Sequence, residues 1–175
     1  MATYKIDPVH SEITFKVRHL MITNVTGSFG KFDATLDSDT ADFTDAKVTF
    51  EADVNSISTN NEQRDGHLKS DDFFSADKFP VLKFASTSIE KKNDEDYVLN
   101  GNLTIRDVTK PVSLKVTYGG TTVDPYGQTK AGFEVEGKIN RKEFGLVWNG
   151  VTETGGIVVS DDVRLNIQAQ MVKQA

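Results

Sequence analysis

The chain has no cysteine among its 175 residues, and only four prolines and one tryptophan. The lack of cysteine excludes disulfide bonds and thiolate metal sites. It leaves the cellular compartment open, because oxidising and reducing compartments both hold cysteine-free proteins. No apolar run approaches the roughly 20 residues that a membrane-spanning helix requires. Lys and Arg number 20 against 26 Asp and Glu, which gives a net charge of -6. This balance disfavours general nucleic-acid binding, which needs a basic surface.

The N-terminus also lacks a recognisable leader. It reads MATYKIDPVHSEITF, without a basic segment followed by an apolar stretch and a small-residue cleavage site. We therefore expect a soluble and, most simply, cytoplasmic protein; a secreted protein whose leader has been removed would look similar. Neither an internal repeat nor a linker marks a boundary, so residues 1–175 are expected to form a single domain with a sizeable core.

Alternation of apolar and polar residues with a period of two is the strongest pattern that the chain does contain. Ile13, Phe15 and Val17 alternate with polar residues, and residues 46–54, 133–139 and 163–170 behave alike. Successive strand side chains point to opposite faces, so each segment has one apolar face. The repetition predicts an all-β protein whose antiparallel sheet curls around an apolar interior. Such an interior is either filled or hollow, and the function depends on which.

The pattern indicates about eight strands and one helical insertion around residues 60–75. A capping box formed by Thr59 and Glu62 predicts a helix that continues to about Lys69, followed by a short turn that ends at Pro80. Gly30 breaks the period of two and predicts a sharp bend. Strands are expected over residues 12–20, 32–36, 46–54, 81–89, 97–105, 112–118, 131–139 and 163–171, with turns near 26–27, 92–94, 119–120 and 124–127.

The densest group of polar residues lies in the expected helix. On a helix, Arg64 and His67 share a face, because residues three and four apart are neighbours. These two side chains could bind an anion, or Asp65 and His67 could act as acid and base. Alternatively, Arg64 and Asp65 pair with neighbouring groups and simply fix the helix on the rim of the barrel.

The three histidines do not form a pattern typical of a metal site. His19 is on the same phase as the apolar residues of the first expected strand and should point inward, either as a hydrogen-bonded core residue or toward a ligand. His10 is on the opposite phase and should be exposed or packed on a loop. The spacing of His10, His19 and His67 matches no zinc motif. Neither a Gly-x-Ser-x-Gly elbow nor a phosphate-binding loop is present, so no metal, cofactor or catalytic group is predicted.

The only tryptophan lies in an apolar segment bracketed by glycines, Phe144-Gly145-Leu146-Val147-Trp148-Asn149-Gly150-Val151. Apolar side chains on a long loop can line a ligand entrance or touch a membrane surface. Equally, such a loop can fold over the barrel end and close the core.

Several motifs together resemble the YceI-like, polyisoprenoid-binding family of bacterial proteins. The resemblance runs from about Asp7 to Ile167, with two departures: this chain shows no leader, and Asp107 stands where the family usually has Gly. The motifs that carry it are Asp7-x-x-His10-Ser11, Phe15-x-Val17-x-His19, Arg64-Asp65-x-His67-Leu68-x-Ser70-x-Asp72-Phe73-Phe74, Pro80 with Phe84, Gly101-x-Leu103-Thr104-Ile105-Arg106, and Arg141-x-x-Phe144-Gly145.

This resemblance implies a lipocalin-like, eight-stranded antiparallel β-barrel whose tunnel binds a long isoprenoid or similar lipid, and it implies that a homodimer is possible. The alternatives are an enzyme that acts on a lipid-like substrate through Asp65 and His67, and a packed barrel that acts through its surface. A polar head group would lie near a barrel end. The expected ligand-binding residues are Phe15, Val17, His19, Val48, Phe50, Arg64, His67, Leu103, Ile105, Val135, Ile139, Trp148, Leu165 and Ile167.

Overall fold

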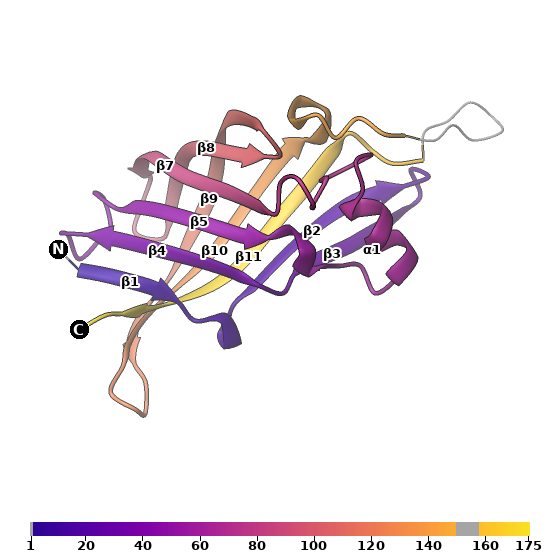
Figure 1. Ribbon diagram of the computed structural model, residues 1–175. Helices are drawn as coiled ribbons and strands as arrows, with labels where there is room; N and C mark the ends of the chain where they lie inside the picture. The colour runs from indigo at the N-terminus through magenta and orange to yellow at the C-terminus, as the bar shows by residue number, and fades with distance from the viewer. Residues whose placement is uncertain (1, 150–157) are drawn as a thin grey trace.

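A computed structural model describes residues 2–149 and 158–175, most of them in β-strands (Figure 1). In the described residues the strands are β1 (Ala2–Ile6), β2 (Glu12–His19), β3 (Thr23–Phe29), β4 (Phe32–Ser38), β5 (Lys47–Asp53), β6 (Ile57–Ser58), β7 (Val81–Lys91), β8 (Asp96–Ile105), β9 (Val108–Val123), β10 (Thr129–Asn140) and β11 (Asp162–Lys173). One helix, α1 (Glu62–Lys69), and three 3-10 turns, η1 (Pro8–His10), η2 (Val54–Ser56) and η3 (Arg141–Phe144), complete the described part of the chain.

The sheet closes on itself as an antiparallel barrel. Eight strands form the ring in the order β1-β4-β5-β7-β8-β9-β10-β11, and β11 pairs back onto β1 through Tyr4 and Lys173. The remaining strands lengthen the ring at one end: β2 pairs with β11 beyond the point where β1 leaves it, β3 pairs with β2, and β6 pairs with β3. The predicted eight-stranded barrel with one short helix is confirmed.

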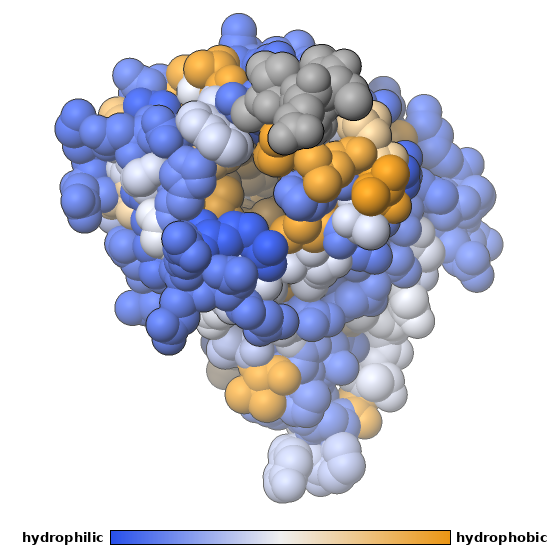
Figure 2. All heavy atoms as spheres, turned by 90° about the vertical axis from the view of Figure 1, so that its right-hand side faces the viewer, coloured by the Kyte–Doolittle hydropathy of each residue, from blue (hydrophilic) through white to orange (hydrophobic). Residues whose placement is uncertain are grey.

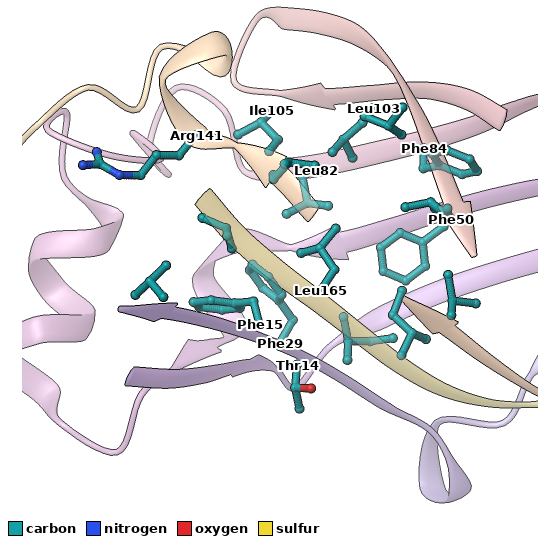
Figure 3. Close-up of a pocket in the computed structure, with 18 of the residues that line it drawn as sticks. Thr14, Phe15, Phe29, Phe50, Leu82, Phe84, Leu103, Ile105, Arg141 and Leu165 are labelled. Atoms are coloured by element: carbon teal, nitrogen blue, oxygen red, sulfur yellow. The ribbon is translucent and has the colours of Figure 1, made fainter. Parts of the chain in front are cut away.

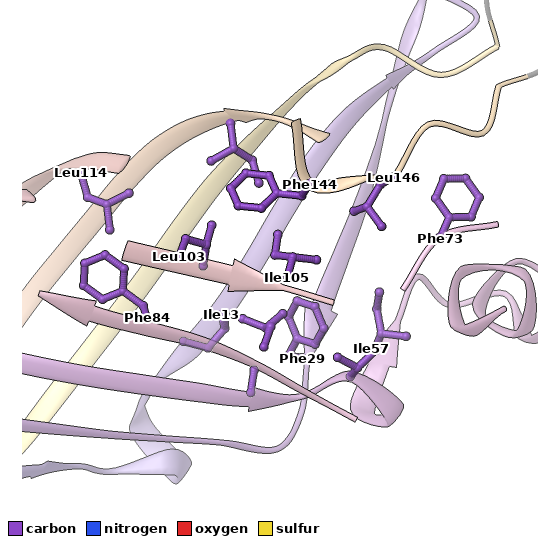
Figure 4. Close-up of a cluster of buried hydrophobic side chains, with 14 of the residues drawn as sticks. Ile13, Phe29, Ile57, Phe73, Phe84, Leu103, Ile105, Leu114, Phe144 and Leu146 are labelled. Atoms are coloured by element: carbon purple, nitrogen blue, oxygen red, sulfur yellow. The ribbon is translucent and has the colours of Figure 1, made fainter. Parts of the chain in front are cut away.

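The inner faces of the strands carry the apolar core, as the alternation predicts. A large cluster extends from the middle of the barrel to the α1 end, and the labelled side chains of Figure 4 point from β2, β3, β7, β8 and β9 toward one another. A smaller cluster occupies the opposite end, around Tyr4, Phe43 and Met171. The two clusters share several partly buried residues, so the apolar interior is continuous along the barrel axis.

The sequence pattern missed three strands and placed two turns wrongly. The short N-terminal strand β1, the strand β3 and the two-residue strand β6 were not expected. Thr26 and Gly27 lie inside β3, whereas the chain reverses at residues 20–22. Gly119 and Gly120 lie inside β9, because the β9–β10 hairpin absorbs the irregularity as a bulge next to Gly132. The bend at Gly30 and the turns at 92–94 and 124–127 are where the sequence predicts them.

The helix has the expected length but a different cap. The side chain of Asn61, not that of Thr59, accepts the hydrogen bond from the backbone N–H of Arg64 that caps α1. The predicted capping box is therefore wrong, because Thr59 is occupied elsewhere: its backbone N–H and its hydroxyl donate to Asp65. The departure at Asp107 leaves the fold intact, since β8 and β9 pair through to Ile105 and Val108 on either side of the two-residue turn.

The N-terminal segment is held to the barrel by a cluster of charges at the end away from α1. Lys130 of β10 lies 3.3 Å from a carboxylate oxygen of Asp7 and 3.4 Å from one of Asp124, and all three side chains are largely buried. Asp7 also accepts a hydrogen bond from the backbone N–H of Val9 and lies 2.8 Å from the His10 ring. The Asp-x-x-His motif thus fixes the passage from β1 to β2, and His10 itself is exposed as expected.

We expect this cluster to make the stability pH-dependent at the acid end. The hydrogen bond with His10, helped by Lys130 and Val9 against partial burial, lowers the pKa of Asp7 from 3.8 to about 2. A lowered pKa in the folded state means that the carboxylate stabilises the fold above about pH 4 and that this contribution is lost as the pH falls toward 2. Asp7→Asn should therefore lower the thermal midpoint at neutral pH, and the difference from the unmodified protein should vanish near pH 2.

Thermal unfolding followed by circular dichroism over this pH range measures the effect. Asp107→Asn is the matched control, since Asp107 is exposed on the β8–β9 turn. A constant difference between Asp7→Asn and the unmodified protein at every pH would contradict the assignment.

Candidate functional site

The interior of the barrel holds an apolar cavity of about 390 Å³. This volume falls in the range of about 300–1,000 Å³ that is usual for small-molecule sites. All eight strands of the ring contribute to its wall, as do β2 and β3. In Figure 3, Phe15, Phe50, Phe84, Leu103 and Leu165 lie around this space.

The burial pattern shows that the interior is hollow rather than filled. Val48, Phe50, Val135, Leu165 and Ile167 line the cavity on inward-facing positions, yet each is only half-buried. In a filled core such side chains would touch one another and lose their exposure, because protein interiors pack as densely as organic crystals. Their remaining exposure is therefore to the cavity.

Two glycines give the aromatic lining its shape. A Cβ atom on Gly27 would lie 2.2 Å from the ring of Phe15 on the neighbouring strand, and one on Gly101 would lie 2.5 Å from the ring of Phe84. Each ring thus lies directly over a glycine and flat against the sheet. This arrangement covers backbone with apolar surface and keeps the rings out of the centre of the barrel.

One end of the cavity is closed by aromatic packing. Phe43, on the loop between β4 and β5, makes edge contacts with Tyr4, Tyr118 and Phe133 at centroid distances of 5.4–5.5 Å. The Tyr97 hydroxyl donates to the carbonyl of Asp42 (2.6 Å) and holds this loop in place. Aromatic rings packed edge to face therefore close this end of the cavity. We call Tyr4, Phe43, Tyr118 and Phe133 the aromatic plug.

The other end opens to solvent and carries the polar residues of the wall. This mouth lies between the β2–β3 turn, α1 and residues 146–149, and Figure 2 shows the hollow there. No Asp or Glu of the described residues lines the cavity, although the chain as a whole is acidic. Among the described residues, the basic side chains of the wall are those of Arg18, His19, Arg64, His67 and Arg141.

Near the mouth, Arg64 and Asp65 pair with neighbouring groups and anchor α1, which was one of the two roles expected for them. Asp65 accepts hydrogen bonds from the Thr59 backbone N–H (2.8 Å) and hydroxyl (2.6 Å). Arg64 donates from Nε to the Thr59 hydroxyl and from Nη2 to the Thr59 carbonyl, both at 2.8 Å. Asp65 and Arg64 thus both hydrogen-bond Thr59 and fix the helix beside the opening.

His67 is placed by a different set of contacts. Its Nε2 lies 2.9 Å from a carboxylate oxygen of Asp72. Its ring packs edge-on against Trp148 (centroids 4.7 Å apart) and Phe73 (5.1 Å). The hypothetical acid–base pair of Asp65 and His67 is thus not hydrogen-bonded as a pair, because each group has another partner.

Arg141 is a site residue that the sequence motif contained but that we did not expect in the cavity wall. Only 2% of it is exposed, and Gly145 (φ 82°) ends the 3-10 turn that holds it. The guanidinium donates to the carbonyls of Ser160 (2.9 Å), Leu146 (2.6 Å), Trp148 (2.7 Å) and Val159 (3.3 Å). Arg141 therefore links two segments beside the mouth, residues 146–148 and residues 159–160, to the end of β10.

All fourteen residues that the sequence suggested as ligand-binding line this one cavity, and their contact with a ligand stays a prediction. Reasoning from sequence missed Arg18, Val25 and Phe29, because β3 was not expected and Arg18 is on the outer phase of β2. The period-two spacing of Val25, Gly27 and Phe29 is the signal that could have revealed β3.

Among the described residues, no group of three or more His, Asp or Glu side chains is placed to hold a metal ion. Within the same ranges, none of the helical segments combines the length and hydrophobicity that crossing a membrane demands.

Fold and site together define a class: closed antiparallel barrels with an apolar cavity that opens at one end. The YceI-like domain model matches residues 4–171, and the chain belongs to the YceI-like family. A UPF0312 protein of Staphylococcus aureus (strain USA300) is 36% identical over 97% of each chain. The crystal structure of a Campylobacter jejuni YceI protein shares 35% identity and 90% of each chain, with a TM-score of 0.78. A polyisoprenoid-binding domain from Saccharophagus degradans shares 98% of each chain at 14% identity and a TM-score of 0.70.

Proposed function

We propose that the protein binds a long-chain isoprenoid or related lipid in its barrel, for carriage, storage or sensing. The observation that carries this proposal is the hollow interior: inward apolar side chains such as Val135 and Leu165 remain half-buried around a cavity of about 390 Å³. The side chains that line this cavity lack packing partners on one side, and larger side chains at these positions would have supplied them.

The energetics favour a chain-like guest. Each buried methylene contributes about 0.8 kcal/mol by transfer from water, so a chain of about twenty carbons gains on the order of 10 kcal/mol before the costs of ordering. The largely apolar wall beyond the mouth would supply this gain without directional contacts. The family and the described polyisoprenoid-binding domain from Saccharophagus degradans, which has the same fold, are consistent with such a guest.

The polar end of the guest would lie at the mouth. There the wall offers His19, Arg64 and His67, while the opposite end is sealed by Phe43 and its aromatic neighbours. A lipid would therefore enter with its tail first and leave its head group at the opening.

Binding, rather than catalysis, is the function we propose. Asp65 is engaged by Thr59 and His67 by Asp72, so the arrangement is that of an anchored helix at the rim. The described part of the cavity wall beyond the mouth consists almost entirely of aliphatic and aromatic side chains, which suit the holding of a guest.

Protein purified under native conditions should carry a long-chain lipid. Organic extraction followed by mass spectrometry measures it, with the extract of an unrelated protein purified from the same cells as the control. Empty extracts from preparations made in several host organisms would contradict the proposal.

A further inference from the structure

The mouth is surrounded by apolar side chains that the fold leaves in solvent. Leu20 (40% exposed), Met21 (51%) and Ile22 (74%) form the turn between β2 and β3, and Val147 (61%) lies next to Trp148. We call these four residues the mouth rim. Only seven large apolar side chains are that exposed among the described residues, and four of them are in the mouth rim. Figure 2, which faces this end, shows apolar side chains in orange beside the hollow.

The two segments of the mouth rim form one structure. The backbone N–H of Leu20 donates to the carbonyl of Val158 (2.8 Å), and His19 pairs with Val159. The side-chain amide of Asn149 donates to the Val159 carbonyl (2.8 Å) and accepts from the N–H groups of Val158 and Val159. The β2–β3 turn is thereby linked through residues 158–159 to the segment that carries Val147.

The turn holds its apolar residues in an unfavourable backbone conformation. Leu20 and Met21 both have positive φ angles, 53° and 61°, and the Ile22 N–H donates back to the His19 carbonyl (3.1 Å). Consecutive left-handed residues in a hairpin turn are normally Asn-Gly or similar, because side chains with a Cβ are strained there. Strain together with exposure is typical of a functional surface rather than of one that serves the fold.

One exposed cation lies directly beside the mouth rim. Arg18 is exposed, lines the cavity and donates from Nη2 to the Met21 carbonyl (2.6 Å), which places a cation directly behind the apolar turn. No carboxylate of the described residues lines the cavity, whereas Arg64, His67 and Arg141 do. Apolar tips with an arginine behind them suit the boundary between acyl chains and phosphates.

We propose that the mouth rim docks on the surface of a lipid bilayer, so that a lipid passes between membrane and cavity without crossing water. This inference rests on the proposed lipid-binding function. A second protein seated on the mouth rim would cover the opening, whereas a bilayer supplies the guest through it. Docking would place the apolar wall of the cavity in line with the acyl chains.

Sedimentation with vesicles of phosphatidylcholine and phosphatidylglycerol in equal amounts tests the proposal. The unmodified protein should bind, and Ile22→Asp should weaken binding by at least about tenfold, because an inserted isoleucine is lost and a charge is added. Val123→Asp is the matched control, since Val123 is another exposed β-branched apolar residue (63%), on the β9–β10 hairpin away from the mouth. It should bind vesicles as the unmodified protein does.

A second variant separates docking from folding. Leu20→Asn combined with Met21→Gly should raise the thermal midpoint, because these residues accept positive φ angles, yet it should weaken vesicle binding. A variant that is more stable and binds as before would overturn the proposal. The proposal would also be overturned if the unmodified protein failed to bind vesicles although its extract contains lipid. A third contradicting result is a protein that binds no vesicles and forms a dimer that Ile22→Asp converts to a monomer. Vesicle binding with empty extracts would instead leave docking supported and count against the lipid-binding function.

Discussion

Val135→Phe is expected to reduce the uptake of a long-chain lipid by roughly two orders of magnitude while the protein stays folded. Val135 lines the cavity from the middle of β10, opposite Ile167 and Val116 on the flanking strands. Phenylalanine would fill space that about four carbon atoms of a guest would otherwise occupy. At about 0.8 kcal/mol per buried methylene, this loss amounts to about 3 kcal/mol of binding free energy.

Titration with a long-chain fatty acid, followed by the fluorescence of Trp148, measures the affinity. Trp148 is the only tryptophan of the chain and lines the cavity at the mouth, so its emission should change as the guest enters. Val123→Phe, on the exposed hairpin, is the control for the substitution itself.

Stability provides the comparison that distinguishes a hollow interior from a filled one. Ala52 is 1% exposed and is packed in the core, so Ala52→Leu should cost about 1–3 kcal/mol of unfolding free energy by overpacking. Val135→Phe should cost clearly less, because it expands into open space. Equal losses of stability together with unchanged affinity would contradict the binding role of the cavity.

Arg141→Met is expected to be the most destabilising substitution at the mouth. It removes the donor of four hydrogen bonds and leaves the carbonyls of Leu146, Trp148, Val159 and Ser160 without that partner. Unsatisfied buried groups cost about 1–3 kcal/mol each, and some of these carbonyls will reach water, so a total loss of about 3 kcal/mol is expected.

Arg141→Lys should recover little of this loss. A lysine ammonium is a single point of charge and cannot match the planar fork that reaches carbonyls on two segments. Burial also lowers the pKa of the Arg141 group, against the attraction of Asp161, so this site already disfavours a cation that is less well hydrogen-bonded.

Denaturant unfolding measures the free energy, and Arg164→Met on the outer face of β11 is the matched control, because Arg164 is exposed. A loss no larger than that of Arg164→Met would show that Arg141 does not hold the mouth together. The near-ultraviolet circular dichroism of Trp148 should weaken in Arg141→Met, since its carbonyl is one of those released.

The barrel was predictable from sequence wherever strands alternate cleanly. Strands such as β5 and β11 present one apolar face without interruption, and their predicted bounds lie within a few residues of those observed. In contrast, β3 reads Thr-Asn-Val-Thr-Gly-Ser-Phe, where Gly27 occupies an inward position that Phe15 covers from the next strand. Because the Phe15 ring covers this position from β2, the sequence of β3 shows only a glycine where the alternation requires an apolar residue.

Turns were harder to predict where the residues at the reversal lack the usual turn preferences. The reversal at residues 20–22 contains no glycine, asparagine or proline, so turn preferences predict the reversal at the nearby Thr26-Gly27 instead. The same limit applies to the residues of the cavity wall. The alternation along the strands predicts that Phe15, Val135 and Ile167 face inward, whereas Arg141 reaches the wall from a 3-10 turn, which has no such alternation. Its role depends on the segments that it joins, which are distant in sequence.

The aromatic plug around Phe43 makes the barrel a dead end. If the cavity binds a lipid as proposed, a second lipid could not enter from the closed end, so exchange would be sequential: the bound lipid would leave completely before the next one entered. The rate of replacement should then equal the rate of spontaneous departure, however much competitor is supplied.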